Sequence, residues 1–379
     1  MKITHLITTL GVGGAEKHLL WLGAGQRQAG HEVSVLYLKG DGELTAAFHE
    51  AGMEVAKVPM ESARALPSAL RQLVATLRSR APDVLHTHLL KADSLGAIAG
   101  RRAGVPVVVA SKHNDERALL KWPVGVVHGL LTRRVDRVIA LSDHVARFVA
   151  EHGRVQRDAI TRIYYGVDAD ALAASRTRAE VRAELGFDER TPVLVCVGRL
   201  APQKDHPTLL AALARLPAEV QLLIVGGDPF GDGEARLRAL AEELGVAGRA
   251  HFLGIRHDVP DLLGASDLFV LPSLWEGLGL VFLEAMAVRL PIVASDVSAI
   301  PEVVDHGVSG WLVPPGDPDA LAAAVTEALE NDLDREVRGV AGHMRLLERF
   351  ALPRMIQETL ALYESALAAS GSPERRPRT

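Results

Sequence analysis

The sequence predicts an α/β protein made of two doubly wound domains, each a parallel sheet with helices on both faces. Three observations predict this class. The chain has 379 residues, which is too long for one ordinary hydrophobic core and suits two. Short β-branched runs alternate with amphipathic stretches along the first half, and a second series of such runs begins near residue 190.

The predicted strands are continuous in apolar residues and bounded by turn residues, which is typical of parallel strands buried on both faces. The first series is KITHLI (2–7), EVSVLYL (32–38), MEVAKV (53–58), DVLHTH (83–88), VPVVVAS (105–111) and VDRVIALS (135–142). The second series is PVLVCVG (192–198), VQLLIVGG (220–227), RAHFLG (249–254), DLFVLPS (267–273) and LPIVAS (290–295).

These series define the expected domains. We expect a first domain over 1–175 and a second over 190–352. A closing helix over 353–370 is expected to cross back to the first domain, and the polar tail 371–379 to be disordered.

Composition narrows the class of protein. The one cysteine, Cys196, lies in an apolar run, so the sequence predicts a buried thiol, no disulfide within the chain and a cytoplasmic location. The N-terminal stretch has no small-residue cleavage site, and no apolar run approaches the roughly 20 residues of a membrane span, so neither a signal peptide nor a transmembrane helix is expected.

Charge is divided unequally between the two halves. Residues 1–150 carry 19 Lys and Arg against 13 Asp and Glu (+6), and residues 151–379 carry 23 against 34 (−11). The first half is therefore expected to face an anionic partner. The acidic second half and an aromatic content of 4% argue against a nucleic-acid partner.

Ligands of doubly wound sheets bind outside the carboxyl ends of the strands, so residues that follow strands are the site candidates. Gly11, Gly13 and Gly14 follow the first strand and precede a helix, where backbone amides can approach a phosphate; the alternative is a plain strand-to-helix turn. The sixth position of the dinucleotide fingerprint is Glu16, which disfavours a dehydrogenase.

Three histidines accompany two later strands of this half. His86 and His88 lie on one side of a predicted strand, where we favour structural support over ligand contact. His113 follows a buried strand and is a site candidate.

In the second half, Arg199 and Lys204 follow a strand that ends at Gly198. Two cations around a proline-containing turn can converge on one diphosphate; a solvated basic loop is the alternative.

The stretch SLWEGLGLVFLEAMA (273–287) predicts a tight turn and a helix beginning near Leu278, whose free amides suit a phosphate. Glu276 precedes this helix and can reach sugar hydroxyls. Glu284 lies within it and can hold a ribose; the alternative is an ordinary surface glutamate.

At these residues the sequence resembles the family 4 retaining glycosyltransferases of GT-B fold over nearly the whole chain. The resemblance is carried by GVGGAEKH (11–18), SKHND (111–115), YYGVD (164–168), VGRLAPQKD (197–205) and SLWEGLGLVFLEAMA. It implies two Rossmann-like domains, the first binding an acceptor and the second a nucleotide-diphosphate sugar. The implied catalytic residues are His113, Arg199, Lys204 and Glu276, and the implied donor-binding residues are Gly13, Gly14, Arg199, Lys204, Glu276, Gly277, Leu278, Gly279, Leu280 and Glu284.

Within this resemblance Arg199 and Lys204 contact the diphosphate, Glu284 the ribose and Glu276 the transferred sugar. His113 lies near the reacting sugar, and the glycine loop near the phosphate and acceptor. Transfer with retention would suit a double displacement with a carboxylate nucleophile. No clear second carboxylate is present for that role, and the resemblance implies a front-face route instead.

No cofactor and no metal are expected, because the Arg and Lys pair supplies the charge that a divalent ion would bring. The Asp168 and Asp170 pair matches a metal-binding Asp-x-Asp only by accident, since it lies in the family's own GVD turn. The family usually has a glycine where this chain has Arg289, which is expected to alter the helix end.

The acceptor is expected to be a saccharide or a lipid-linked saccharide of cell-envelope or exopolysaccharide synthesis, and the donor a UDP or GDP sugar. Residues 101–137 hold eight Lys and Arg against three Asp and Glu around an apolar, Trp-containing run. This segment is either a peripheral contact with anionic membrane or a core helix with a basic edge. A nucleotide-sugar epimerase and a non-catalytic nucleotide-sugar-binding subunit remain the alternative functions.

Overall fold

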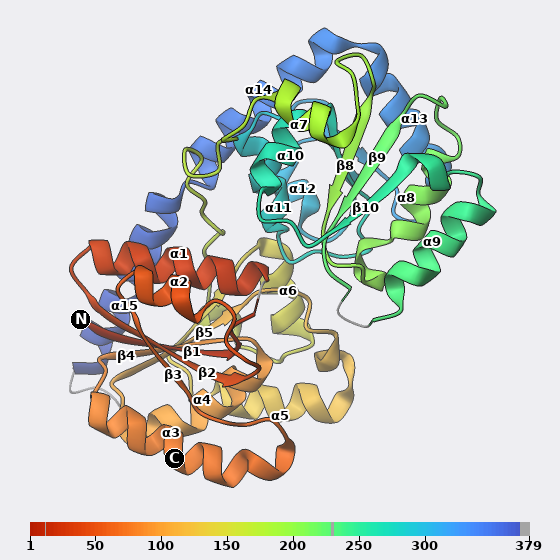
Figure 1. Ribbon diagram of the computed structural model, residues 1–379. Helices are drawn as coiled ribbons and strands as arrows, with labels where there is room; N and C mark the ends of the chain where they lie inside the picture. The colour runs from red at the N-terminus through yellow and green to blue at the C-terminus, as the bar shows by residue number, and fades with distance from the viewer. Residues whose placement is uncertain (12, 229–230, 372–379) are drawn as a thin grey trace. The chain divides into compact units, whose positions relative to one another are not determined.

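The computed structural model describes residues 1–11, 13–228 and 231–371, which form two compact units (Figure 1). Unit 1 is Met1–Gly166 together with Leu352–Thr379, and unit 2 is Val167–Ala351. The first boundary therefore lies at 166 and not at 175, and the stretch 176–189 belongs to unit 2. Gly371, expected in the tail, is the last residue of a helix, and residues 372–379 lie outside the described residues.

Unit 1 is built on a sheet of seven parallel strands in the order β3-β2-β1-β4-β5-β6-β7. Helices α1 and α15 cover one face, and α3 and α4 cover the other (Figure 1). The strands are β1 Lys2–Thr9, β2 Glu32–Lys39, β3 Glu54–Lys57, β4 Val84–His88, β5 Val107–Lys112, β6 Arg137–Ala140 and β7 Ile160–Arg162. The helices are α1 Gly14–Gln28, α2 Thr45–Glu50, α3 Leu66–Arg80, α4 Leu90–Ala103, α5 Trp122–Thr132, α6 Asp143–Glu151 and α15 Leu352–Gly371.

Unit 2 is built on a sheet of six parallel strands in the order β10-β9-β8-β11-β12-β13. Helices α8, α9 and α13 lie on one side of it, and α7, α10 and α11 on the other (Figure 1). The strands are β8 Val193–Val197, β9 Gln221–Val225, β10 Ala250–Gly254, β11 Leu268–Leu271, β12 Ile292–Ser295 and β13 Gly310–Val313. The helices are α7 Arg178–Leu185, α8 His206–Leu213, α9 Gly233–Glu243, α10 Val259–Ala265, α11 Leu280–Ala287, α12 Ile300–Val303, α13 Pro318–Glu330 and α14 Asp332–Arg349.

The predicted class is therefore confirmed: both sheets are parallel and covered on two faces. Among the described helices, none combines the length and the apolar composition that a bilayer crossing requires.

The two faces of the first sheet carry different cores. Leu6, Leu85 and Val108 point toward α3 and α4 and belong to a fully buried apolar cluster. Because side chains alternate along a strand, His5 and His86 point to the opposite face, where both are completely buried. The side of the sheet under α1 and α15 thus has a polar core.

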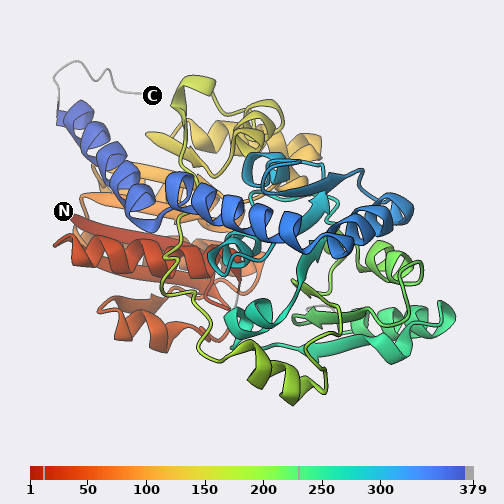
Figure 2. The same ribbon diagram turned by 90° about the horizontal axis from the view of Figure 1, so that it is seen from above.

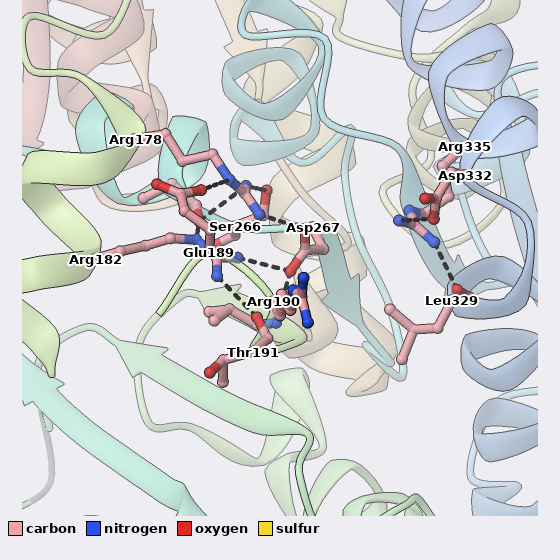
Figure 3. Close-up of polar contacts among 12 residues, drawn as sticks. Arg178, Arg182, Glu189, Arg190, Thr191, Ser266, Asp267, Leu329, Asp332 and Arg335 are labelled. Carbon is pink, nitrogen blue, oxygen red and sulfur yellow. Dashed lines mark hydrogen bonds and ion pairs between the residues drawn. The ribbon is translucent and has the colours of Figure 1, made fainter. Parts of the chain in front are cut away.

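Helix α7 is attached to unit 2 by two of its arginines, which explains why the second unit begins before its first strand (Figure 3). Arg182, 1% exposed, donates to Asp267 at 2.8 Å and to the carbonyl of Thr191 at 2.8 Å. Arg178 donates to the other oxygen of Asp267 at 2.6 Å. Asp267 also accepts the backbone N–H of Val193, so one carboxylate joins α7 to the starts of β8 and β11.

Arg289 terminates α11 in the conformation that a glycine would adopt. Its φ is +59°, the N–H of Arg289 donates to the carbonyl of Met286, and the N–H of Leu290 donates to that of Ala285. These two bonds form a Schellman motif, in which glycine is the preferred residue at this position. The departure from the family pattern therefore leaves the helix end unaltered and places backbone strain in it.

Replacing Arg289 with glycine is expected to stabilise unit 2 by about 0.5–1 kcal/mol, because the left-handed conformation costs a Cβ-bearing residue about 1–2 kcal/mol and glycine little. The control is Arg289→Ala, which removes the guanidinium but keeps the Cβ. Thermal unfolding measures both variants, and an equal stabilisation by alanine would show that φ is not the cause.

Candidate functional site

The site of unit 2 lies at the point where the chain changes direction across the sheet. From β8 the chain continues to β9 on one side, and β11 occupies the other side. The loops that follow β8 and β11 therefore leave the sheet next to each other, at the position where doubly wound folds bind ligands. These loops carry the predicted residues Arg199, Lys204 and Glu276.

Glycines bring the ends of the neighbouring strands together. Gly226, which follows β9, has a φ of +150°, and a Cβ on it would lie 2.0 Å from the carbonyl oxygen of Gly198. A Cβ on Gly198 would lie 3.1 Å from Cε of Lys204. The lysine side chain therefore lies directly over the end of β8.

Lys204 and Glu276 form a nearly buried ion pair with additional donors. Nζ of Lys204 lies 2.5 Å from Oε1 of Glu276, and the two side chains are 12% and 6% exposed. The hydroxyl of Ser273 donates to the same oxygen at 2.8 Å, and the amide of Gln203 donates to Oε2 at 3.3 Å. The amide of Gln203 also donates to the carbonyl of Trp275 at 2.8 Å, which fixes the loop after β11 to the loop after β8.

Helix α11 begins beside this pair. It starts at Leu280, two residues later than predicted, because Gly279 adopts a φ of +84° and serves as the N-cap. No side chain caps its N-terminus. Gly277 and Leu278 are buried in the preceding turn, and Glu284 lies within the helix at 5% exposure, which removes the surface alternative for this residue.

The remaining predicted cation of unit 2 is arranged differently. Arg199 is exposed, and the described residues give its guanidinium no ion pair. The structure thus brings Lys204 and Glu276 together and leaves Arg199 exposed on the loop that follows β8. Gln203 and Ser273 lie within the quoted motifs but were not predicted as site residues.

Unit 1 has the corresponding change of direction between β1 and β4, with Gly13 and Gly14 at the start of α1. A Cβ on Gly13 would lie 2.5 Å from Oε2 of Glu16, so this glycine gives room for the glutamate. Glu16 is 8% exposed, lies in the first turn of α1 and accepts the hydroxyl of Thr9 at 2.7 Å. The N-terminus of α1 therefore already holds a carboxylate, which disfavours a second anion there.

His113 is the end of a chain of hydrogen-bonded imidazoles below the first sheet's carboxyl edge. Nε2 of His5 lies 2.8 Å from Oε1 of Gln26, and Nδ1 of His5 lies 3.0 Å from Nε2 of His88. Nδ1 of His88 lies 3.0 Å from Nε2 of His113, whose Nδ1 lies 2.8 Å from the hydroxyl of Tyr165. Because the amide oxygen accepts, each neutral ring carries its proton on Nε2, and the tyrosine hydroxyl donates.

His86 forms a second set of hydrogen bonds beside this chain of histidines. Nδ1 of His86 lies 2.5 Å from the hydroxyl of Tyr363 in α15, and Nε2 lies 2.7 Å from the hydroxyl of Ser111. One ring nitrogen from each of His5, His86 and His88 lies within 4.8 Å of the other two, a spacing that also suits a metal ion. Both ring nitrogens of all three histidines already have hydrogen-bond partners, so the geometry favours a hydrogen-bonded core.

Burial keeps these rings neutral. It lowers the pKa of His5 to about 4 and that of His113 to about 3, the latter aided by the charge of Lys112. It also lowers the pKa values of His86 and His88 well below the ordinary 6.5. Since both nitrogens of His113 have partners, direct contact with a sugar requires His113 to exchange one of them.

His18 differs from the other histidines beneath the first sheet. It lies on α1 at 3% exposure, 5.5 Å from the ring of His113, and its Nδ1 has no hydrogen-bond partner among the described residues. It was not predicted as a site residue, although it is the last residue of the motif GVGGAEKH.

The first aspartate of the Asp-x-Asp match, Asp168, stabilises a local turn. Oδ1 of Asp168 accepts the backbone N–H groups of Asp170 and Ala171 at 3.1 and 3.3 Å, which forms an Asx turn. This arrangement agrees with the interpretation of the pair as part of a turn.

Comparison with known proteins decides the family. Residues 177–342 match the profile described as "Glycosyl transferases group 1", and residues 12–171 match "Glycosyltransferase Family 4". The alpha-maltose-1-phosphate synthase of Mycolicibacterium smegmatis is 31% identical over 349 residues, which cover 82% of this chain and 87% of that relative. The chain belongs to the family 4 glycosyltransferases.

Other relatives of this glycosyltransferase agree. The UDP-Gal:alpha-D-GlcNAc-diphosphoundecaprenol alpha-1,3-galactosyltransferase of Escherichia coli is 29% identical over 276 residues, covering 69% of this chain and 70% of that relative. The crystal structure of Anabaena HepE in complex with UDP and glucose has a TM-score of 0.89 and 26% identity, covering 96% of this chain and all of that one. The predicted GT-B fold of two Rossmann-like domains is thereby confirmed.

Proposed function

We propose that this glycosyltransferase is a retaining, metal-independent hexosyltransferase that moves a sugar from a nucleotide-diphosphate sugar to a hydroxyl of a saccharide or lipid-linked acceptor. The observation that carries the proposal is the Lys204–Glu276 pair, held at 2.5 Å where β8 and β11 end, beside the N-terminus of α11. The chain's membership of the family 4 glycosyltransferases supports glycosyl transfer as the class of reaction.

The reaction explains why a cation belongs at this position. When the bond between the anomeric carbon and the diphosphate oxygen breaks, negative charge develops on the diphosphate and positive charge on the sugar. A preoriented ammonium and the amides of a helix N-terminus lower the energy of that charge separation. Lys204 is preoriented by Glu276, and Arg199 is available to the second phosphate.

The acceptor oxygen forms the new bond to the anomeric carbon, and its proton passes to the departing diphosphate oxygen. Glu276 is a poor nucleophile for a double displacement, because Lys204, Ser273 and Gln203 all donate to its carboxylate. This is the argument for the front-face route. With two cations at the diphosphate, the proposal includes no metal.

For the donor we propose a UDP sugar. Anabaena HepE, which is 26–27% identical to this chain, was crystallised with UDP, with UDP and glucose, and with UDP-glucose. The Escherichia coli relative is named for UDP-Gal and a diphosphoundecaprenol acceptor, which supports a lipid-linked saccharide of cell-envelope or exopolysaccharide synthesis.

Unit 1 has a surface that suits a lipid-linked acceptor held at a membrane. Helix α5 packs on unit 1 through small residues: a Cβ on Gly125 would lie 2.6 Å from the carbonyl oxygen of His152. Three of its large apolar residues are turned outward and are between 50% and 73% exposed: Trp122, Val127 and Leu130. Leu120, just before the helix, is 49% exposed. Exposed basic residues flank them: Arg117, Lys121, Arg133 and Arg134.

This exposure argues against the core-helix alternative. An apolar patch with a basic margin suits the surface of an anionic membrane. We therefore include peripheral membrane contact, on the cytoplasmic face, in the proposal.

Vesicle flotation tests the membrane contact. We expect the protein to float with phosphatidylglycerol vesicles at low salt, and Trp122→Glu with Leu130→Glu to abolish flotation. Ile255→Glu, which changes an exposed apolar residue of unit 2, is the control and should still float. Equal flotation of all three proteins, or of none, would contradict the assignment to α5.

Incubation with UDP, GDP and ADP sugars in the presence of EDTA tests the reaction. Release of the nucleoside diphosphate with transfer to an added acceptor or to water supports the proposal. An isomerised nucleotide sugar would indicate an epimerase, and binding without turnover a non-catalytic subunit. Activity that requires added Mg²⁺ would contradict the metal-independent route.

Glu284 and Glu276 are expected to separate binding from transfer. Glu284→Ala should weaken UDP binding about tenfold, the value of one good charge-assisted hydrogen bond to the ribose. Glu276→Ala should leave UDP binding within a few-fold and lower the transfer rate instead. Calorimetric titration with UDP and initial rates measure the two effects, and wild-type values in both variants would refute the assignment.

A further inference from the structure

Helix α14 attaches to unit 2 through one narrow face. Gly339 and Gly342 are buried, and a Cβ on Gly339 would lie 2.1 Å from the carbonyl oxygen of Arg289. Leu346 is fully buried on the same face. The glycines let α14 lie close to unit 2, so its position there is well defined.

The opposite face of α14 is apolar and exposed. Figure 2 shows α14, in blue, as an unbroken helix along the outside of unit 2. Its outward residues are spaced by four, three, four and three positions and are between 43% and 71% exposed: Leu333, Val337, Val340, Met344 and Leu347. This is the 3.5-residue repeat of a coiled-coil seam, over 18 residues or about 27 Å of helix.

We propose that α14 pairs in parallel with α14 of a second copy of this chain. In that arrangement each of the five seam residues meets its own counterpart. In heptad notation the seam residues alternate between d and a positions. Antiparallel pairing places each a position opposite a d position of the second copy, which leaves one of the five seam residues without a partner. Three of the five seam residues, Leu333 and Leu347 at d positions and the β-branched Val337 at an a position, follow the pattern that favours two parallel strands.

The charges beside the seam exclude an anionic membrane as the occupant. Asp332, Glu336 and Glu348 are exposed along it. The nearby Arg335 and Arg338 are already paired with Asp332 and Asp334 of the same helix. A parallel pair places Glu336 opposite Ala341 and His343 opposite Glu348 of the second copy, so no acid faces an acid.

The contact is small. A single helix pair buries less than the roughly 800 Å² per partner of a standard interface, so we expect a dissociation constant on the order of 10 μM. Sedimentation of the full chain between about 1 and 100 μM measures it. Dimer formation in this range supports the proposal, and a monomer at 100 μM would overturn it.

Matched variants locate the contact. Val340→Glu with Met344→Glu is expected to remain monomeric at 100 μM, whereas Ile255→Glu, exposed elsewhere in unit 2, should dimerise like the wild type. Melting temperature and UDP binding verify that the variants are folded. A seam variant that still dimerises would overturn the proposal even if the sugar-transfer activity is as proposed.

Disulfide formation tests the orientation. The one native cysteine, Cys196, is fully buried, and burial raises the pKa of its thiol to about 12, so it does not interfere. In a parallel pair, Leu333→Cys and Leu347→Cys should each cross-link to themselves on mild oxidation. Cross-linking only between Leu333→Cys and Met344→Cys in a mixture would overturn the parallel arrangement.

Discussion

Lys204→Met is expected to lower the transfer rate by about 10²–10³-fold, the usual cost of removing a preoriented group that stabilises developing negative charge. The substitution keeps most of the side-chain volume over Gly198 and removes the positive charge. Single-turnover release of the nucleoside diphosphate from the donor measures the chemical step directly. A rate within threefold of the wild type would refute the role of Lys204.

A double variant separates catalysis from stability. Lys204→Met alone leaves the nearly buried carboxylate of Glu276 without its cation, which we expect to lower the melting temperature. Adding Glu276→Gln removes that unpaired charge, so the melting temperature should recover while transfer does not. Lys57→Met, which breaks the surface pair of Lys57 with Glu61, is the control for loss of one positive charge.

Unit 1 is expected to unfold sharply as the pH falls below 6.5. The folded pKa values of His5, His18, His86, His88 and His113 are lowered by burial, whereas the unfolded chain titrates near 6.5. The stability contributed by these neutral rings is therefore fully present above pH 6.5. It is lost as the pH falls below 6.5, because the histidines of the unfolded chain then bind protons that the buried rings do not. Keeping each ring neutral costs about 1.4 kcal/mol per pH unit below 6.5, so over two pH units five rings cost about 14 kcal/mol, comparable with a typical stability of 5–15 kcal/mol.

Urea unfolding between pH 8 and 4.5 measures this effect, with hydrogen exchange in β1 and β4 as the local readout. His18→Gln removes one buried ring. The slope of the free energy of unfolding against pH should therefore fall by the equivalent of about one bound proton. His257→Gln, which changes an exposed histidine, should leave the slope unchanged. A urea midpoint that stays constant down to pH 4.5 would contradict the neutral, buried cluster.

The sheets could be predicted because their central strands are continuous apolar runs. The two strands that were missed, β7 and β13, are edge strands of three and four residues. The boundary of unit 2 was placed too late for another reason. The contacts that hold α7 join Arg178 and Arg182 to Asp267, more than 80 residues away, and no local pattern records them.

The individual site residues could be predicted, because they are charged residues that follow strands. The contacts between them could not. Lys204 and Glu276 were each selected, yet their pairing with each other follows from the adjacency of β8 and β11. The histidine network was visible only in part. The spacing of His86 and His88 indicated one face of a strand, whereas Gln26 and Tyr363 reach the cluster from distant helices.

The place of α15 in unit 1 has a consequence for synthesis on the ribosome. Tyr363 closes the polar core beneath the first sheet, so the domain that begins at Met1 is completed only when the last helix has been translated. Unit 2 is one uninterrupted segment and is able to fold before that. The first half of the polypeptide therefore waits for the second, and nascent chains that end before residue 363 expose an unfinished histidine-lined surface.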